Sequence, residues 1–95
     1  MKLFLDDLRN PPDDNWIVVR NEEAFKQFII QFGVPDLISF DHDLGGEETG
    51  MNCAKWLVEN NYIIKDFIVH SANPVGRANI EGLLNNWRKF KQNSL

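Results

Sequence analysis

The sequence predicts an α/β fold: a single domain over residues 1–95, with a four-stranded parallel sheet and three helices. Two observations lead to this prediction. Short segments rich in apolar and β-branched residues alternate with longer segments that repeat apolar residues at helical spacing. Such alternation is typical of parallel sheets with right-handed crossovers. A chain of 95 residues is also long enough for one modest core but not for two.

Four short segments are expected to be strands. Residues 2–5 form an apolar run that stops at two aspartates, and residues 16–20 (WIVVR) are aromatic and β-branched. Residues 36–41 (DLISFD) and 66–70 (DFIVH) complete the set. The segment between the first two strands, LRNPPDDN at 8–15, is rich in turn formers and too short for a crossover helix, so it is predicted to be a loop.

Three longer segments are expected to be helices. The first begins after Asn21, a favourable N-cap, and ends at Gly33. The second covers about 51–61, and the third covers about 74–91 with Pro74 in its first turn. The first is the clearest, because its apolar residues share one helical face: Ala24, Phe25, Phe28, Ile29 and Phe32.

The strands are apolar enough to be covered on both faces of the sheet. Right-handed crossovers place the first two helices on the same face. We therefore expect the C-terminal helix to fold across the opposite face. A dimer interface over that face is the alternative, so two-layer and three-layer arrangements, and a monomer and a homodimer, are all open.

Composition excludes several classes of protein. The net charge of −4 and the sequence pI near 5.0 argue against an extended nucleic-acid surface. One cysteine, Cys53, cannot form an internal disulfide and fits a reducing cytoplasm. The apolar run at the N-terminus is too short for a signal peptide, and no segment approaches the length of a membrane span. We expect a cytoplasmic protein that does not enter a membrane.

Polar clusters follow three of the predicted strands. The carboxyl ends of parallel strands meet at one edge of the sheet, where open α/β sheets bind ligands. This topology therefore predicts that the three clusters form one site. They are Asp6-Asp7 after the first strand, Asp41-His42-Asp43 after the third, and His70-Ser71-Ala72-Asn73 after the fourth.

The four aspartates of these clusters predict a divalent cation site. Carboxylates packed together repel one another, and a hard cation relieves that repulsion. Oxygen ligands from Asp6, Asp7, Asp41 and Asp43 favour Mg²⁺ or Mn²⁺. The alternative for each pair is a solvated turn, with Arg9 as an ion-pair partner of the first pair.

Two histidines and several further polar residues complete the candidate site. His70 and His42 are candidate general acid–base groups, because imidazole titrates near neutral pH. Arg77 and Arg9 are candidate phosphate ligands, together with the N-terminal region of the last helix. Ser71 and Asn73 belong to that region, although either could simply cap the helix.

The motifs resemble the response-regulator receiver fold. FLDD, VVRNEEAFKQF and PDLISFDHDL are similar to receiver segments in which an acidic pair and a strand-end aspartate hold Mg²⁺. The resemblance places Asp6 and Asp7 at the acidic pair and Asp41 at the phosphoacceptor position. It implies a flavodoxin-like sheet of order 2-1-3-4, truncated because the first crossover helix, the fifth strand and its phosphate-reading lysine have no counterpart.

A closer resemblance is to the cyclic-phosphate-processing receiver domains. It is carried by LDDLRNPP, DHDLGGEETG and VHSANPVGRANIEGLL, and it extends over nearly the whole chain. The resemblance implies action on cyclic nucleotides or on 2′,3′-cyclic phosphate ends of RNA. The resulting hypothesis is a metal-dependent phosphoesterase that opens a cyclic phosphodiester, with Asp41, His70 and His42 as its catalytic residues. The alternatives are a non-catalytic module that binds a cyclic nucleotide, and a degenerate phosphoacceptor receiver.

Overall fold

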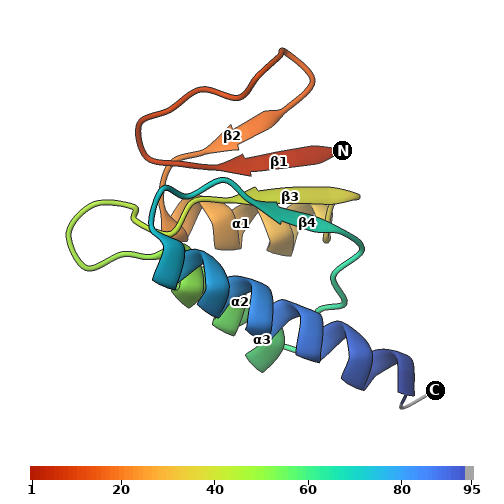
Figure 1. The fold of residues 1–95 in the computed structure, drawn as a ribbon. Coiled ribbons are helices and arrows are strands. Elements are labelled where there is room, and N and C mark those ends of the chain that lie inside the picture. The colour runs from red at the N-terminus through yellow and green to blue at the C-terminus, as the bar shows by residue number, and fades with distance from the viewer. Residues whose placement is uncertain (94–95) are drawn as a thin grey trace.

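The computed structural model describes residues 1–93 and contains four strands and three helices in this part of the chain. Figure 1 shows the sheet above and the helices below it. The elements, in chain order, are β1 (Lys2–Leu5), β2 (Ile17–Val19), α1 (Glu22–Phe32), β3 (Leu37–Phe40), α2 (Gly50–Glu59), β4 (Phe67–Val69) and α3 (Pro74–Asn93).

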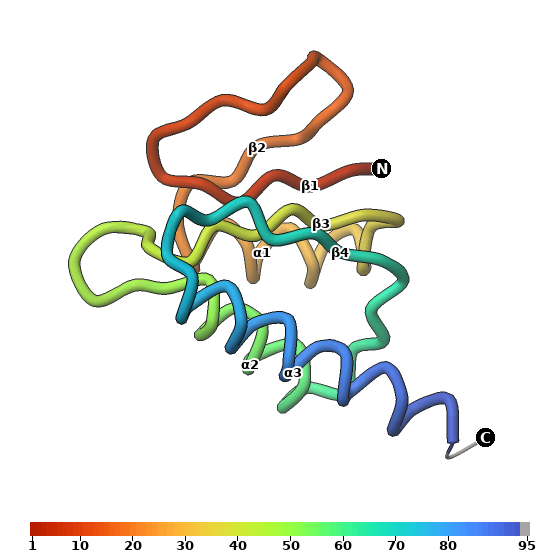
Figure 2. Tube along the Cα trace, in the orientation of Figure 1, coloured from red at the N-terminus to blue at the C-terminus, as the bar shows by residue number. Residues whose placement is uncertain are grey.

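The four strands form one parallel sheet in the order β2-β1-β3-β4, as predicted. Leu3 of β1 lies opposite Ile17 on one side and Ile38 on the other, and Ile38 lies opposite Phe67. This register aligns the carboxyl ends of the strands. The segments that follow β1, β3 and β4 therefore leave the sheet at the same edge (Figure 2).

One face of the sheet carries the hydrophobic core. Leu3, Leu5, Phe40 and Val69 on this face belong to a single buried cluster with residues of all three helices. The helices begin and end as local rules predict: the Asn21 side chain accepts a hydrogen bond from the Ala24 N–H, and Gly33, at φ +82°, ends α1. No helix within residues 1–93 has the length and apolar character needed to cross a bilayer.

The prediction that the C-terminal helix covers the opposite face is wrong. The helix α3 packs beside α2, on the same side of the sheet as α1, so the fold has two layers (Figure 1). Ile80 and Leu84 of its apolar stripe are fully buried in the common core. Placing α3 on the other face would remove these side chains from the only large apolar cluster that they can join.

The opposite face is covered in part by its own side chains. Phe4 is 5% exposed but lies outside the core cluster. The His70 ring stacks on it, with centroids 4.4 Å apart and planes 7° apart, and Trp16 meets it edge-on. Ile68, farther along the same face, is about half exposed. These aromatic contacts bury Phe4 without a second helical layer.

Substitution of Ile80 tests the packing of α3. We expect Ile80→Ala to lower the free energy of unfolding by about 2–5 kcal/mol, because it removes buried volume at a fully enclosed position. Val75, on the same helix, is 69% exposed, and Val75→Ala should change stability by no more than about 0.5 kcal/mol. Urea unfolding followed by circular dichroism measures both. Equal effects would contradict the observed orientation of α3.

Candidate functional site

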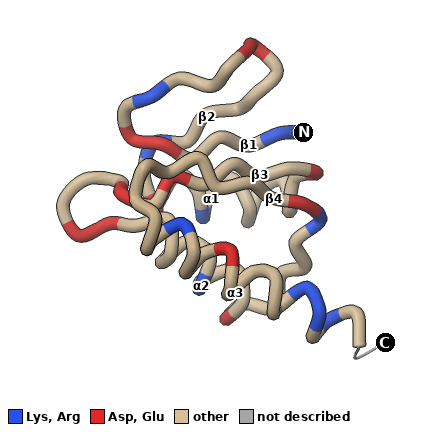
Figure 3. Tube along the Cα trace, viewed as in Figure 1, with Lys and Arg blue, Asp and Glu red and all other residues tan. Residues whose placement is uncertain are grey.

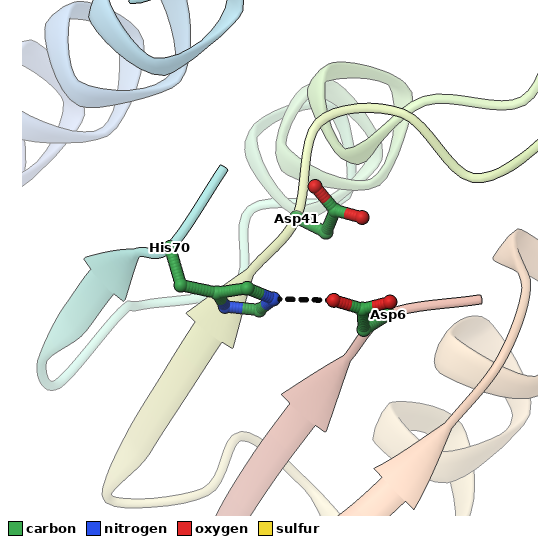
Figure 4. A group of neighbouring side chains, drawn as sticks. All are labelled: Asp6, Asp41 and His70. Atoms are coloured by element: carbon green, nitrogen blue, oxygen red, sulfur yellow. Dashed lines mark hydrogen bonds and ion pairs between the residues drawn. The ribbon is translucent and has the colours of Figure 1, made fainter. Parts of the chain in front are cut away.

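The polar clusters at the strand ends converge on one place. Asp6, Asp41 and His70 offer ligand atoms that all lie within 4.8 Å of one another (Figure 4). Beside them is an open cavity of about 350 Å³. Its lining comes from the segments after β1, β3 and β4: Asp6, Asp7, Leu8, Arg9, Asp41, Asp43, Gly45, Ser71 and Ala72.

Asp6 is fully buried, and four donors surround its carboxylate. The backbone N–H groups of Leu8 and Arg9 donate to Oδ1, at 2.9 and 2.8 Å. His70 Nε2 and Arg9 Nε lie 2.9 and 3.2 Å from Oδ2. Burial by itself raises the pKa of Asp6, but the two backbone hydrogen bonds and His70 outweigh it and hold the pKa below its usual value. Asp6 is therefore ionised at neutral pH.

Asp41 is in the opposite situation, although it is also buried. Burial raises the pKa of its carboxyl group, and the negative charge of Asp6 raises it further. A hydrogen bond from the His42 backbone N–H lowers the pKa, as do the nearby Arg9 and His70 side chains, but together they offset only part of this effect. The nearest cationic atom is Arg9 Nη2, 3.6 Å from Asp41 Oδ1. A negative charge on Asp41 is thus incompletely compensated by the protein alone.

His70 is held by contacts on both ring nitrogens and on one ring face. Ser39 Oγ lies 2.6 Å from Nδ1, and Asp6 Oδ2 lies 2.9 Å from Nε2. The Phe4 ring stacks on the imidazole. The ionised Asp6 can accept a hydrogen bond from Nε2–H, and the Ser39 hydroxyl can then donate to Nδ1. These three residues fix the position and the orientation of His70.

Two arginines organise the segment that follows β1. The Arg9 guanidinium bridges Asp6 and Asp41, which is the ion-pair alternative considered for this residue. Arg20, just after β2, donates from Nη1 to the backbone carbonyls of Asp6 and Arg9 and from Nη2 to Asn10 Oδ1. Arg20 therefore ties the start of the proline-rich loop to the sheet edge.

The segment between β3 and α2 brings Asp43, but not His42, to the cavity. Asp43 pairs with Thr49 in an isolated antiparallel bridge. The His42 side chain is mostly buried and is absent from the cavity lining; its Nδ1 lies 2.9 Å from Asp43 Oδ1. Its ring lies directly against Gly76, where an added Cβ would collide with the imidazole. His42 therefore reaches the cavity only through Asp43.

Of the candidate phosphate ligands, some line the cavity and others do not. Ser71, 8% exposed, lines the cavity, and its Oγ accepts a hydrogen bond from the Asn73 N–H. The Asn73 side chain accepts from the Gly76 N–H, so it caps α3. Arg77 is exposed, lies 3.6 Å from Glu81, and does not line the cavity. Of these groups, only Ser71 and Arg9 lie at the cavity.

Three residues of the site escaped the sequence analysis. Ser39 carried a signal, because it is a polar residue inside the otherwise apolar strand LISF. Arg20 follows a strand, so the rule that located the other clusters applies to it as well. Phe4 carried no signal, because an aromatic residue in a buried strand is ordinary. Its role becomes visible only when the sheet register places it beside His70.

The cluster suits a divalent cation. Two buried carboxylates lie close together, and burial and the charge of Asp6 both raise the pKa of Asp41. Asp7 and Asp43 line the same cavity and add carboxylate oxygens. Oxygen donors are the ligands of Mg²⁺, and an imidazole nitrogen from His70 would favour Mn²⁺.

Comparison with known protein families gives one informative match. The family described as the cyclic-phosphate processing receiver domain matches residues 1–86. These residues include all four strands and most of α3. No curated protein and no solved structure matches the chain.

Two glycines of α3 provide a matched test of the His42 packing. We expect Gly76→Ala to lower the free energy of unfolding by about 1–3 kcal/mol, because the new methyl group displaces the His42 ring. A methyl group added at Gly82 would meet no atom within 4 Å, so Gly82→Ala should raise stability by about 0.5–1 kcal/mol through helix propensity. Thermal unfolding and the NMR signals of the His42 ring measure these effects. An unperturbed His42 in Gly76→Ala would contradict the packing.

The pKa shifts of the two buried aspartates predict opposite effects of amidation. In metal-free protein at pH 7, Asp6→Asn should be destabilising. The pKa of Asp6 is lower in the folded state than in the unfolded state, so its ionised form stabilises the fold at pH values above the unfolded-state pKa. Asp41→Asn should be stabilising, because the raised pKa of Asp41 makes its ionised form unfavourable in the fold.

Both effects should shrink as the pH falls. The Asp41→Asn gain should vanish below about pH 3, where Asp41 is protonated in both states. The Asp6→Asn loss should diminish as the pH falls through the lowered pKa of Asp6. Urea unfolding in EDTA at several pH values measures both trends, and two effects of the same sign at pH 7 would refute the assignment.

Proposed function

Because the chain belongs to the family of cyclic-phosphate processing receiver domains, we propose that it is a metal-dependent phosphoesterase that opens a cyclic phosphodiester. The substrate class is a cyclic nucleotide or the 2′,3′-cyclic phosphate end of an RNA. The observation that carries the proposal is the convergence of Asp6, Asp41 and His70 beside a cavity that also exposes Asp7, Asp43 and Arg9.

The charge of the cavity supports a requirement for metal. Four aspartates line it, and Arg9 is the only Lys or Arg among the described lining residues. A phosphodiester anion entering this cavity alone would be repelled. We propose that Asp6, Asp7 and Asp41, with Asp43, hold Mg²⁺ or Mn²⁺. When bound, the ion would polarise a phosphoryl oxygen and lower the pKa of a water molecule.

Arg9 and Ser71 are the proposed contacts to the phosphoryl oxygens. Arg9 is half exposed, and its guanidinium already lies between Asp6 and Asp41. Rotation of this long side chain would place one N–H on a non-bridging oxygen while another stays on Asp6. Ser71 Oγ lies at the cavity wall and can donate its own proton. Arg77 stands outside this geometry and would have to leave Glu81 to join it.

His70 is the proposed proton-transfer group. In the hydrolysis, the water oxygen bonds to phosphorus and one ring P–O bond breaks. His70 takes the proton that the water loses and returns it to the leaving oxygen. To take this proton at Nε2, the ring must carry its own hydrogen on Nδ1, where it donates to Ser39 Oγ, and Nε2 must turn from Asp6 to the water. His42, packed on Gly76 and hydrogen-bonded to Asp43, is proposed to orient that carboxylate.

The experiment is a hydrolysis assay with defined substrates. Purified protein is incubated with 2′,3′-cyclic nucleotides, 3′,5′-cyclic nucleotides and cyclic dinucleotides in Mg²⁺ or Mn²⁺, and products are resolved by chromatography. We expect turnover that EDTA abolishes. Asp41→Asn and His70→Gln should each lower kcat/KM by at least about 100-fold, because they remove a metal ligand and the proton-transfer group.

Asp14→Asn is the matched control for the charge change. Asp14 is exposed in the proline-rich loop and does not line the cavity, so its amidation should leave turnover unchanged. Because Asp41→Asn is expected to stabilise the metal-free fold, its loss of activity cannot be attributed to unfolding. Absence of turnover on every substrate, or full activity in both site variants, would sink the enzymatic proposal.

The second candidate function is binding without cleavage. This alternative is favoured because both ring nitrogens of His70 are already hydrogen-bonded, to Ser39 and to Asp6, and neither is free to exchange a proton with a substrate. Calorimetry that detects metal-dependent binding of a cyclic nucleotide, with no product after prolonged incubation, would establish this alternative. A degenerate phosphoacceptor at Asp41 would instead show NMR shifts around Asp41 with beryllofluoride.

A further inference from the structure

A second concave surface lies at the far end of α3 from the strand-end cavity. It is an open groove of about 650 Å³ between the segment that precedes β4 and the last turns of α3. Figure 3 shows Lys and Arg gathered along this end of α3. The groove is lined by Ile63, Ile64, Lys65, Asn85, Trp87, Arg88, Lys89, Lys91 and Gln92.

The groove is positively charged in a protein of net charge −4. It holds four of the ten Lys and Arg residues of the chain, and its described lining includes no Asp or Glu. Two carboxylates outside the lining form long ion pairs with it: Asp36 is 3.6 Å from Lys65, and Asp66 is 3.8 Å from Arg88. These two carboxylates offset only part of the charge of the four lining cations. An anionic occupant would therefore be attracted.

The floor of the groove is apolar and firmly held. Ile64 is buried in the core, whereas its neighbour Ile63 is 60% exposed. The Trp87 indole packs against the core, and its Nε1–H donates to the Tyr62 carbonyl at 2.8 Å. Ile63 therefore offers exposed apolar area to an apolar side chain of a partner.

We propose that this groove docks an acidic, amphipathic segment of a partner protein, with an apolar side chain on Ile63 and carboxylates on Lys65, Arg88 and Lys89. Charge complementarity identifies the occupant. A helix or strand with one apolar and one acidic face matches the exposed Ile63 and the cationic side chains that line the groove.

Two other anionic surfaces fit the groove less well. Single-stranded RNA relies on bases stacked on open aromatic rings. The Trp87 ring is already stacked against Phe90, and the Lys91 ammonium, which also donates to Asn61, lies over it. An anionic membrane is bound by a protruding apolar face rather than by a concave one. The observations therefore favour a protein segment.

The test uses the full chain and a synthetic probe. The probe is an amphipathic helical peptide with Leu and Phe on one face and Glu on the other, titrated into ¹⁵N-labelled protein. We expect saturable shifts of the Trp87 indole N–H and of the backbone signals of residues 63–65 and 85–92. Ile63→Ser and the double variant Arg88→Glu, Lys89→Glu should each weaken binding by about tenfold or more, because they remove the apolar contact and reverse the rim charge.

Controls separate this docking from general charge attraction. Lys55 is exposed on α2 and outside the groove, so Lys55→Glu makes a charge reversal that should leave affinity within about twofold. A peptide with Lys in place of Glu should not bind. The proposal is overturned if no saturation occurs up to about 1 mM acidic peptide. It is equally overturned if Lys55→Glu weakens binding as strongly as the groove variants, or if oligouridylate or phosphatidylserine vesicles bind the groove and the peptide does not.

Discussion

The structure depends on how it holds two buried carboxylates side by side. Asp6 and Asp41 follow adjacent parallel strands, so the sheet itself brings them together. Backbone N–H groups, His70 and Arg9 stabilise the charge of Asp6, whereas Asp41 remains short of positive charge. This unequal arrangement gives the strand-end cavity its capacity for a cation. It also explains why the surrounding residues are polar groups fixed by hydrogen bonds rather than a solvated turn.

The two-layer fold contributes directly to this site. All three helices pack on one face, and the other face carries Phe4, Trp16 and the ring of His70. A helix on that face would cover the stack, whereas the proline-rich loop leaves it at the surface. Ser39, on the same face, sets the orientation of the imidazole. Phe4 and Ser39 on the open face of the sheet therefore hold His70 in place, and the loop after β1 supplies Arg9.

The long helix α3 joins two chemically different ends of the molecule. Its first turn, capped by Asn73, lies beside the acidic cavity, and Gly76 accommodates His42 there. Its last turns carry the cationic rim of the groove. The acidic segments after β1 and β3 and the basic last turns of α3 thus form two distinct surfaces at opposite ends of this helix. The proposed phosphate-handling cavity and the proposed docking groove would then not compete for the same ligand.

The sequence alone determined the strands, the helices, the strand order implied by the receiver resemblance, and the edge at which the acidic clusters meet. These features follow from local apolar periodicity and from the geometry of parallel strands, which hold wherever the chain folds this way. Only the tertiary structure decided the side of the sheet that α3 covers, because both faces looked apolar until Phe4 was seen packed against Trp16 and His70. It also separated His42 from the cavity and brought Ser39 to His70. Side-chain direction at a strand end depends on register and on neighbours distant in sequence, and no local pattern encodes them.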